Sequence, residues 1–182
     1  MKSCVINTGY QSDTHRANVC DVGKKANSKD QTKNMRLIAV GRMKDQAEKA
    51  LMGRYMKRLR PAFEIIELPD GRGTPVEIKR KEARAILAAC PSHAYVIALD
   101  ESGAHWHSVA LAQTLQKWQE HGRLLCFVIG GAEGLDASIR QRADYCLSLG
   151  LLTWPHMLVR IMLVEQLYRA QTIIAGHPYH RA

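Results

Sequence analysis

The 182-residue sequence lacks the features that mark several common classes of protein. It has no apolar run long enough to cross a bilayer, and its N-terminus lacks the apolar core of a secretory signal. None of its five cysteines belongs to a CxxC pair and their number is odd, so neither a disulfide framework nor a zinc site is expected. These absences predict a cytoplasmic protein with no membrane partner and no metal.

The chain also lacks the lysine of a phosphate-binding P-loop, although Ile129–Asp136 (IGGAEGLD) is rich in glycine. Glu133 within this segment would repel a phosphate, so a nucleotide hydrolase is disfavoured. Three glycines in five residues let the backbone turn tightly and approach a ligand closely. On the glycines alone, an ordinary strand-to-helix turn is an equal alternative.

What the sequence does have is a globular composition with an excess of basic residues. Hydrophobic residues make up 46% and charged residues 24%, and the formal net charge is +9. This charge favours a polyanionic partner, although charge alone is weak support. Residues 1–34 combine six Lys or Arg with three Asp and carry no apolar periodicity, which predicts a disordered basic leader. Residues 35–182 are then expected to form one domain.

From Met35 onward, short apolar runs alternate with helical patterns. This alternation predicts an α/β fold with a mostly parallel sheet that helices cover on both faces. In the first helix, Ala47, Ala50, Leu51 and Tyr55 are expected to face inward. The predicted strands are Met35–Val40, Phe63–Leu68, Ala94–Asp100, Leu124–Ile129 and a brief one near Tyr145–Ser148. The predicted helices are Gln46–Arg58, Pro75–Cys90, Ser108–His121 with Ser108 as its cap, a short one from Asp136, and Pro155 to about Ala175.

Three segments stand where such a sheet binds ligands, beyond the carboxyl ends of its strands: Leu99–Glu101, Gly130–Gly134 and Leu149–Trp154. The last lies within Leu147–His156 (LSLGLLTWPH), which is apolar enough to predict a buried loop. Buried backbone groups need partners, which a ligand such as adenine could supply. The alternative is a buried strand that runs directly into a helix.

The last helix and the tail after it carry further candidate residues. Met157–Tyr168 is apolar on nearly every face, which predicts a place in the core or in a subunit interface. Glu165 and Arg169 interrupt it at i, i+4 spacing, where a plain salt bridge is an alternative to a functional role. His177–Arg181 place two His, a Tyr and an Arg together, groups that can contact phosphate and stack on bases. On composition alone, terminal disorder remains the simpler interpretation.

Taken in order, these motifs are similar to those of one known family. FVIGGAEGLD, followed by LSLGLLTWPHMLVRIMLVEQLYRAQTIIAGHPYHR, resembles the RlmH family of ribosomal RNA methyltransferases, and RLIAVGRMKD and ALDESG also match. The resemblance covers about Met35 to Ala182. It implies a C-terminal trefoil knot of the SPOUT (α/β knot) class and a homodimer. It also implies methyl transfer from S-adenosyl-L-methionine to N3 of a pseudouridine in 23S ribosomal RNA.

The resemblance also implies residue roles. Contacts to the cofactor would come from Leu99, Gly130, Gly131, Leu149, Gly150, Leu151, Leu152, Thr153 and Trp154. The substrate side of the same cleft, which is the catalytic set, would comprise Glu165, Arg169, Tyr179, His180 and Arg181. Ala132 stands where the family commonly has proline, which relaxes the turn without removing its glycines.

Within the catalytic set, His180 is a candidate base or relay because histidine titrates near neutral pH. Arg169 or Arg181 could stabilise negative charge that develops on the carbonyl oxygens beside N3. The alternative is that all three only position the RNA. Two other functions stay open: a ribosome-binding protein that keeps the fold without catalysis, and a knotted methyltransferase that acts on transfer RNA. The first predicts no affinity for the cofactor, and the PYHR ending argues against the second.

Overall fold

A computed structural model describes residues 35–181 of the chain, so the leader predicted for residues 1–34 lies outside the described part. Five parallel strands form one sheet in the order β2-β1-β4-β3-β5. The strands are β1 (Met35–Val40), β2 (Glu64–Leu68), β3 (Tyr95–His105), β4 (Leu125–Ile129) and β5 (Tyr145–Ser148). The helices are α1 (Gln46–Met56), α2 (Pro75–Ala89), α3 (Ser108–Glu120), α4 (Ala137–Arg142) and α5 (His156–Ile174).

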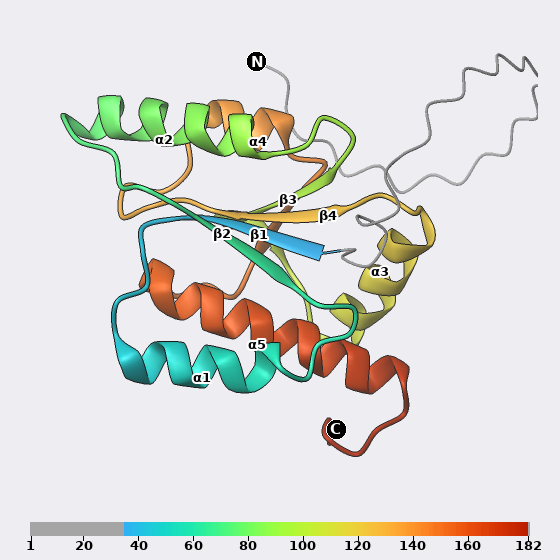
Figure 1. The fold of residues 1–182 in the computed structure, drawn as a ribbon. Helices are drawn as coiled ribbons and strands as arrows, with labels where there is room; N and C mark the ends of the chain where they lie inside the picture. Colours follow the sequence, from blue (N-terminus) through green and yellow to red (C-terminus); the bar gives the residue numbers. More distant parts are fainter. Residues whose placement is uncertain (1–34, 182) are drawn as a thin grey trace, which may run out of the picture.

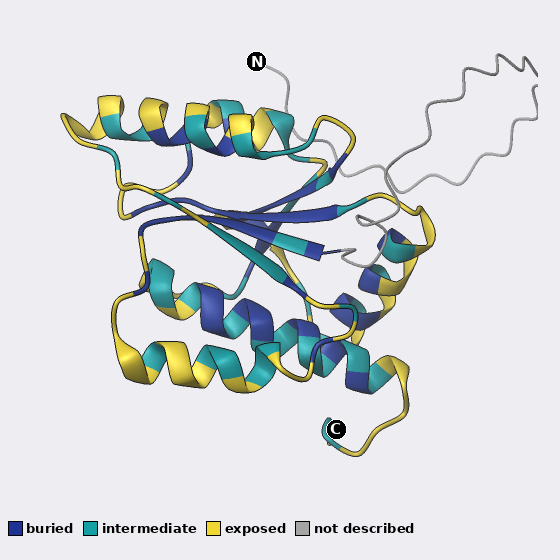
Figure 2. Cartoon of the chain, in the orientation of Figure 1, coloured by how far each residue is buried: buried dark blue, intermediate teal, exposed yellow. Residues whose placement is uncertain are grey.

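Helices cover both faces of this sheet, as the alternating pattern predicted. Figure 1 shows α2 and α4 on one face and α1, α3 and α5 on the other. Side chains alternate between the faces along each strand. Leu37 and Ala39 of β1 therefore pack in the α1–α3–α5 layer, whereas Ile38 and Val40 pack in the α2–α4 layer. The strands between the layers are mostly buried (Figure 2), so the α/β fold is confirmed.

Local sequence signals account for where two of the helices begin. At α2, the Thr74 side chain accepts a hydrogen bond from the Glu77 amide, and the Glu77 carboxylate accepts one from the Thr74 amide. This reciprocal cap and the proline at position 75 fix the start that the sequence predicted. The prediction for α3 was wrong by one residue. His107 is the capping residue, and the Ser108 hydroxyl instead donates to the Gln166 side chain of α5, 2.8 Å away.

The inward face of α1 differs from the prediction. Ala47, Ala50 and Leu51 are exposed, and the residues that pack against the core are Met52, Tyr55 and Met56. The sequence could not separate these two stripes because apolar residues occupy both sides of the helix. The choice is made by α5, whose Tyr168 ring lies 6.1 Å from the ring of Tyr55. One apolar side of α1 is consequently left uncovered.

A buried arginine fixes the start of α5 against the sheet. Arg160 is fully buried, and its guanidinium donates to the backbone oxygens of Val40 and Gly41 and pairs with Glu67 at 3.1 Å. A charge without such partners would be very costly to bury. The contacts therefore hold the first turns of α5 beside the carboxyl ends of β1 and β2. Leu163, one turn further on, is also fully buried.

Candidate cofactor pocket and tail cluster

A hollow of about 680 Å³ lies at the carboxyl edge of the sheet, between the ends of β3, β4 and β5 and the start of α5. Eight of the nine residues predicted to contact the cofactor line it: Leu99, Gly130, Gly131, Leu149, Gly150, Leu152, Thr153 and Trp154. Leu151 does not line it and is 90% exposed. The structure thus brings together the three segments that sequence reasoning placed beyond the strand ends.

The glycine-rich turn after β4 is packed too closely for larger residues. A Cβ atom on Gly130 would lie 3.0 Å from the backbone of Gly134, and one on Gly131 would lie 2.9 Å from Oε2 of Glu82. Gly134 adopts a φ of +76°, which glycine accommodates without steric cost, and its amide donates to the Gly131 carbonyl at 3.1 Å. The glycines therefore shape the floor of the pocket, with Gly131 resting on a carboxylate.

That carboxylate, Glu82 of α2, was missed by the sequence reasoning. Glu82 is 5% exposed, and its Oε1 atom accepts a hydrogen bond from the Gly71 amide at 3.0 Å. Its Oε2 atom is shielded from solvent and has no hydrogen-bond partner among residues 35–181. Its position beside Ala83 and Ile86 on the buried stripe of α2 was the available signal. Glu82 links the loop before α2 to the glycine turn beneath the pocket.

We expect Glu82→Ala to lower the melting temperature and to weaken cofactor binding. The half-buried Gly71 amide would lose its acceptor, at a cost of about 1.5–3 kcal/mol for a bond to a charged group. For a domain of this size that corresponds to roughly 5–10 °C in a thermal melt. Glu120→Ala, at the exposed end of α3, is the matched control. A melting temperature equal to that of the control would show that Glu82 does not support the turn.

A charged pair forms one wall of the pocket. Leu99 and Ala104 of β3 both lie opposite Leu147 of β5, so the residues between them bulge out of the strand. In this bulge Asp100 pairs with Arg140 of α4 at 3.2 Å. Burial opposes the charge on Asp100, but hydrogen bonds from Ser102 and Arg140 outweigh it and lower the pKa of this carboxyl. The wall therefore carries an ionised carboxylate that is already paired.

The opposite wall is the loop after β5, and the expectation that this loop is buried was wrong. Ser148 is buried, and its hydroxyl donates to the Gly150 carbonyl at 2.9 Å. Beyond it, Leu152 is 69% and Trp154 is 39% exposed. Residues 35–181 leave most of the Leu152 side chain uncovered and cover Trp154 only in part. An apolar wall of this kind suits the face of a flat, uncharged ring.

His156, the first residue of α5, also lines the pocket and was not predicted to do so. Burial, and then the nearby charge of Arg160, lower the pKa of its imidazole. The carboxylates of Asp70 and Glu82 oppose this shift without reversing it. His156 is therefore a neutral imidazole at neutral pH, able to donate and to accept hydrogen bonds.

A second cluster forms where the chain turns back after α5. Gly176, with a φ of +65°, ends the helix in the left-handed conformation and lets the tail reverse direction. The ring of Tyr179 then packs edge-on against Tyr168, with 4.9 Å between centroids, and its hydroxyl donates to Glu165 at 3.0 Å. Burial, and next the hydrogen bonds with Tyr55 and Glu165, raise the pKa of Tyr179. The tail is thus an ordered part of the fold through Tyr179.

Arg169 completes this tail cluster. Its guanidinium pairs with Glu165, which raises the pKa of Arg169, and it also lies over the ring of Tyr179 at 4.9 Å. The ion pair that the i, i+4 spacing allowed is therefore present, and both of its residues also contact Tyr179 of the tail. His180 is half-buried, and its Nδ1 atom has no hydrogen-bond partner among residues 35–181. Arg181 is exposed.

The structure does not bring the tail cluster and the pocket together within one chain. None of the five residues predicted as catalytic lines the pocket. Val159 lines it, whereas Arg169 lies ten residues further along α5, which is roughly 15 Å at 1.5 Å per residue. The resemblance had placed both sets in one cleft, and a single copy of the chain leaves them at opposite ends of one helix.

Residues 35–181 contain neither a candidate metal-binding cluster nor a candidate membrane-spanning helix. No group of three or more His, Cys, Asp or Glu side chains is placed to hold a metal ion. No helix in this part of the chain has the length and apolar character needed to span a membrane.

Comparisons with known proteins agree on one family. Residues 33–180 match the family described as "Predicted SPOUT methyltransferase". A protein of Gluconacetobacter diazotrophicus named ribosomal RNA large subunit methyltransferase H is 55% identical over 148 residues, which are 81% of this chain and 97% of the relative. A protein of the same name from Acidiphilium cryptum is also 55% identical over 148 residues, covering 81% of this chain and 94% of the relative.

Among solved structures, a probable methylase family protein from Haemophilus influenzae has a similar fold. The TM-score is 0.50 at 11% identity, and the match covers 83% of this chain and 72% of that chain. At such low identity the likeness supports the fold alone.

Proposed function

Because the chain belongs to the SPOUT methyltransferases, and within them to the family of ribosomal RNA large subunit methyltransferase H, we propose that it methylates N3 of a pseudouridine in large-subunit (23S) ribosomal RNA, with S-adenosyl-L-methionine as the donor. The observation that carries this proposal is the pocket at the carboxyl edge of the sheet, which eight of the residues implied by the family resemblance line. A basic sequence and a cytoplasmic location suit an RNA substrate.

The pocket fits such a donor. Its volume of about 680 Å³ is in the range of small-molecule sites. Its apolar wall, Leu149–Trp154, suits an adenine ring, and the open backbone of that loop offers hydrogen-bonding groups to the edge of the ring. When bound, S-adenosyl-L-methionine supplies a methyl group on a positively charged sulfur. The sulfur leaves as a neutral thioether, so its departure needs neither an acid nor a metal.

The contribution of the protein is then to position the base and to move one proton. Holding the nucleophilic nitrogen in line with the methyl group supplies most of the acceleration. The proton on N3 must leave, and we assign its acceptance to His180, a half-buried histidine of the tail. Arg181 is exposed and free to stabilise the charge on the flanking carbonyl oxygens, whereas Arg169 is held by Glu165.

The separation of the pocket from the tail cluster supports a homodimer in which each tail serves the pocket of its partner. Helix α1 lies alongside α5 (Figure 1), and both carry exposed apolar side chains: Ala47 and Leu51 on α1, and Leu158, which is 38% exposed, near the start of α5. We infer that these side chains form one apolar surface that a second copy would cover. An antiparallel pairing of two α5 helices would bring each tail cluster to the other copy's pocket.

We expect Leu158→Arg to shift the protein to monomers in sedimentation and to abolish methyl transfer, because a charge would enter the apolar interface. Leu87→Arg is the matched control, since Leu87 is also 38% exposed but lies on α2 in the other helix layer. Leu163 is unsuitable as an interface position, because its full burial within one chain means that Leu163→Arg would unfold the protein. A Leu158→Arg protein that stays dimeric and active would refute the proposed interface.

The same family membership underlies a proposed C-terminal trefoil knot, in which the segment from β5 into α5 passes through the loop formed by the chain before it. The pairing of β5 with the outer side of β3, followed by the return of α5 beneath β4, is compatible with this path. The knot would hold the glycine turn and the loop at Leu149–Trp154 side by side.

An assay with purified protein separates the proposal from its two alternatives. Labelled S-adenosyl-L-methionine is supplied with ribosomal RNA, with transfer RNA or with intact large subunits, and incorporation of label is followed. We expect incorporation into large-subunit RNA alone. Incorporation into transfer RNA would indicate the sister activity, and the absence of donor binding would indicate a ribosome-binding protein without catalysis.

A further inference from the structure

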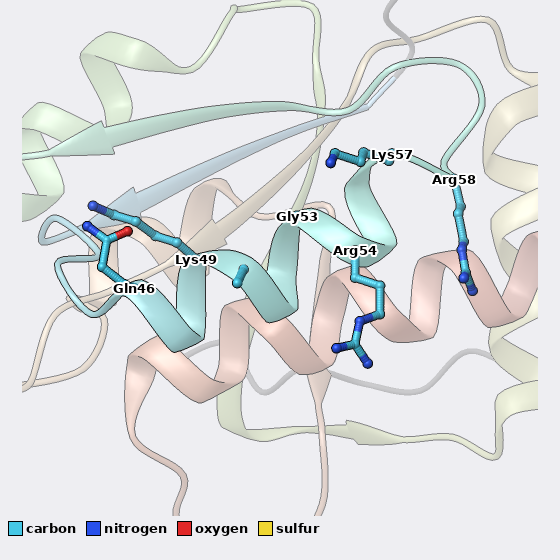
Figure 3. A pocket seen from close by; sticks show the side chains of 7 residues that line it. Gln46, Lys49, Gly53, Arg54, Lys57 and Arg58 are labelled. Atoms are coloured by element: carbon cyan, nitrogen blue, oxygen red, sulfur yellow. The ribbon is translucent and has the colours of Figure 1, made fainter.

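The solvent side of α1 carries a cluster of positive charge outside the site described above. A shallow hollow of about 690 Å³ is lined entirely from this helix and the two residues after it: Gln46, Lys49, Ala50, Gly53, Arg54, Lys57 and Arg58. Four of these seven residues are cations and none is a carboxylate. We call Lys49 and Lys57, which extend to the same side of α1 (Figure 3), the α1 basic face.

No carboxylate of the described chain neutralises these cations. None of the four forms an ion pair with a carboxylate of residues 35–181. Figure 3 shows Lys49 and Lys57 extending to one side of α1, with Arg54 and Arg58 extending to the other. Lys57 and Arg58 follow Met56, the last residue of α1, where positive charge interacts favourably with the helix dipole. The cations therefore need no carboxylate partner among the described residues and stay available to a polyanion.

Gly53 lies in the last turn of α1, on the floor of the hollow. Glycine within a helix costs about 1 kcal/mol relative to alanine. No steric reason demands it, since a Cβ atom at this position would meet nothing within 4 Å. Its effect is to leave the floor of the hollow bare between Lys49 and Lys57. Such a local departure from a stable helix is found at functional surfaces.

Arg58 connects the end of α1 with the tail cluster. The guanidinium of Arg58 lies over the ring of Tyr168 at 5.7 Å, and Tyr168 packs against Tyr179 of the tail. A strand bound along α1 would therefore lead towards Tyr179 and His180.

We propose that the α1 basic face binds the phosphate backbone of the ribosomal RNA beside the target nucleotide, as a second RNA contact distinct from the tail. This inference rests on the proposed function for the identity of the RNA. Cations on a bare helix surface recognise phosphates through charge, without reading sequence. The face therefore contributes affinity, and the tail contributes the chemistry.

The test compares two double variants that remove the same charge. Lys49→Gln with Lys57→Gln neutralises the α1 basic face, and Gln preserves the helix. Arg80→Gln with Arg84→Gln, at exposed positions on α2 in the other helix layer, is the control for bulk charge. Binding of a large-subunit RNA fragment is measured across salt concentrations, beside donor binding, melting temperature and the rate of methyl transfer at saturating RNA.

We expect the α1 variant to bind the RNA about tenfold more weakly and to lose about 1.5 from the slope of log affinity against log salt. Its rate at saturating RNA and its donor affinity should match those of the unaltered protein, so KM rises while kcat does not. Unchanged RNA affinity, or an equal loss in the α2 variant, would overturn the inference. So would a loss of binding to large subunits with naked RNA unaffected, since that would identify a protein contact.

Failure of the inference is distinguishable from failure of the proposed function. If the unaltered protein methylates ribosomal RNA and the α1 variant binds it equally well, only the inference fails. If the unaltered protein binds RNA through the α1 basic face but transfers no methyl group, only the proposed function fails. If the unaltered protein does not bind RNA at all, both fail.

Discussion

Removal of residues 177–182 is expected to abolish methyl transfer to ribosomal RNA while leaving the affinity for S-adenosyl-L-methionine within about twofold. The tail contributes none of the residues that line the pocket, so donor binding should not depend on it. It does contribute His180 and Arg181, and loss of a proton acceptor alone costs about 100-fold or more in rate. Single-turnover methyl transfer and calorimetric titration of the donor, on the same preparation, measure the two quantities.

Point variants show whether the tail acts through its chemistry or through packing. His180→Ala should lower the single-turnover rate and change its dependence on pH, with little effect on donor binding. His121→Ala, at an exposed position just after α3, is the matched control and should leave both unchanged. Tyr179→Phe removes the hydroxyl that donates to Glu165 but keeps the ring on Tyr168. Wild-type rates in the truncated protein would show that the tail has no part in the reaction.

Substitution of Gly131 by arginine is expected to abolish donor binding altogether. A side chain at position 131 would not point at the ligand but at Glu82, with its Cβ atom 2.9 Å from Oε2. Because Glu82 is buried and held by the Gly71 amide, the turn must move instead, and it would move into the pocket. Calorimetric titration with S-adenosyl-L-methionine should then detect no binding.

The smaller substitution Gly131→Ala distinguishes this explanation from a direct clash with the ligand. Alanine should weaken donor binding, and adding Glu82→Ala should restore part of the affinity because the obstructing carboxylate is removed. Gly122→Asn is the control, since Gly122 has a φ of +66° in open space, where asparagine is tolerated. If Gly131→Arg binds the donor normally, the glycine turn does not form the floor of the site.

Most strand and helix limits were predictable because their signals are local. Apolar runs bounded by turn residues predicted β1 and β4 within one residue, and Pro75 marked the start of α2. The prediction for β3 was wrong at its end, because the strand resumes after the bulge and runs to His105 instead of stopping at Asp100.

The inward face of α1 was only partly predictable. Tyr55 faces inward as predicted, but apolar residues lie on both sides of the helix. Only packing against α5 decides that Met52 and Met56 face inward and that Ala47 and Leu51 do not.

The site shows the same division between local and long-range information. The glycine turn and the loop at Leu149–Trp154 were identified from their own sequence and their likeness to a family, and the structure places both at one pocket. Glu82 and His156 were missed because their roles depend on Gly131 and Arg160, which are distant in sequence. Apolar composition could not predict that the loop at Leu149–Trp154 is largely exposed whereas Leu163 is buried, because both are equally apolar.

Mass mapping of methylated nucleotides in 23S ribosomal RNA tests the central claim most directly. Ribosomal RNA is compared between cells that have the protein, cells that lack it, and cells that carry only the form without residues 177–182. We expect one additional methyl group, on N3 of a pseudouridine, only in the cells that have the unaltered protein. An identical methylation map in the presence and absence of the protein would contradict it.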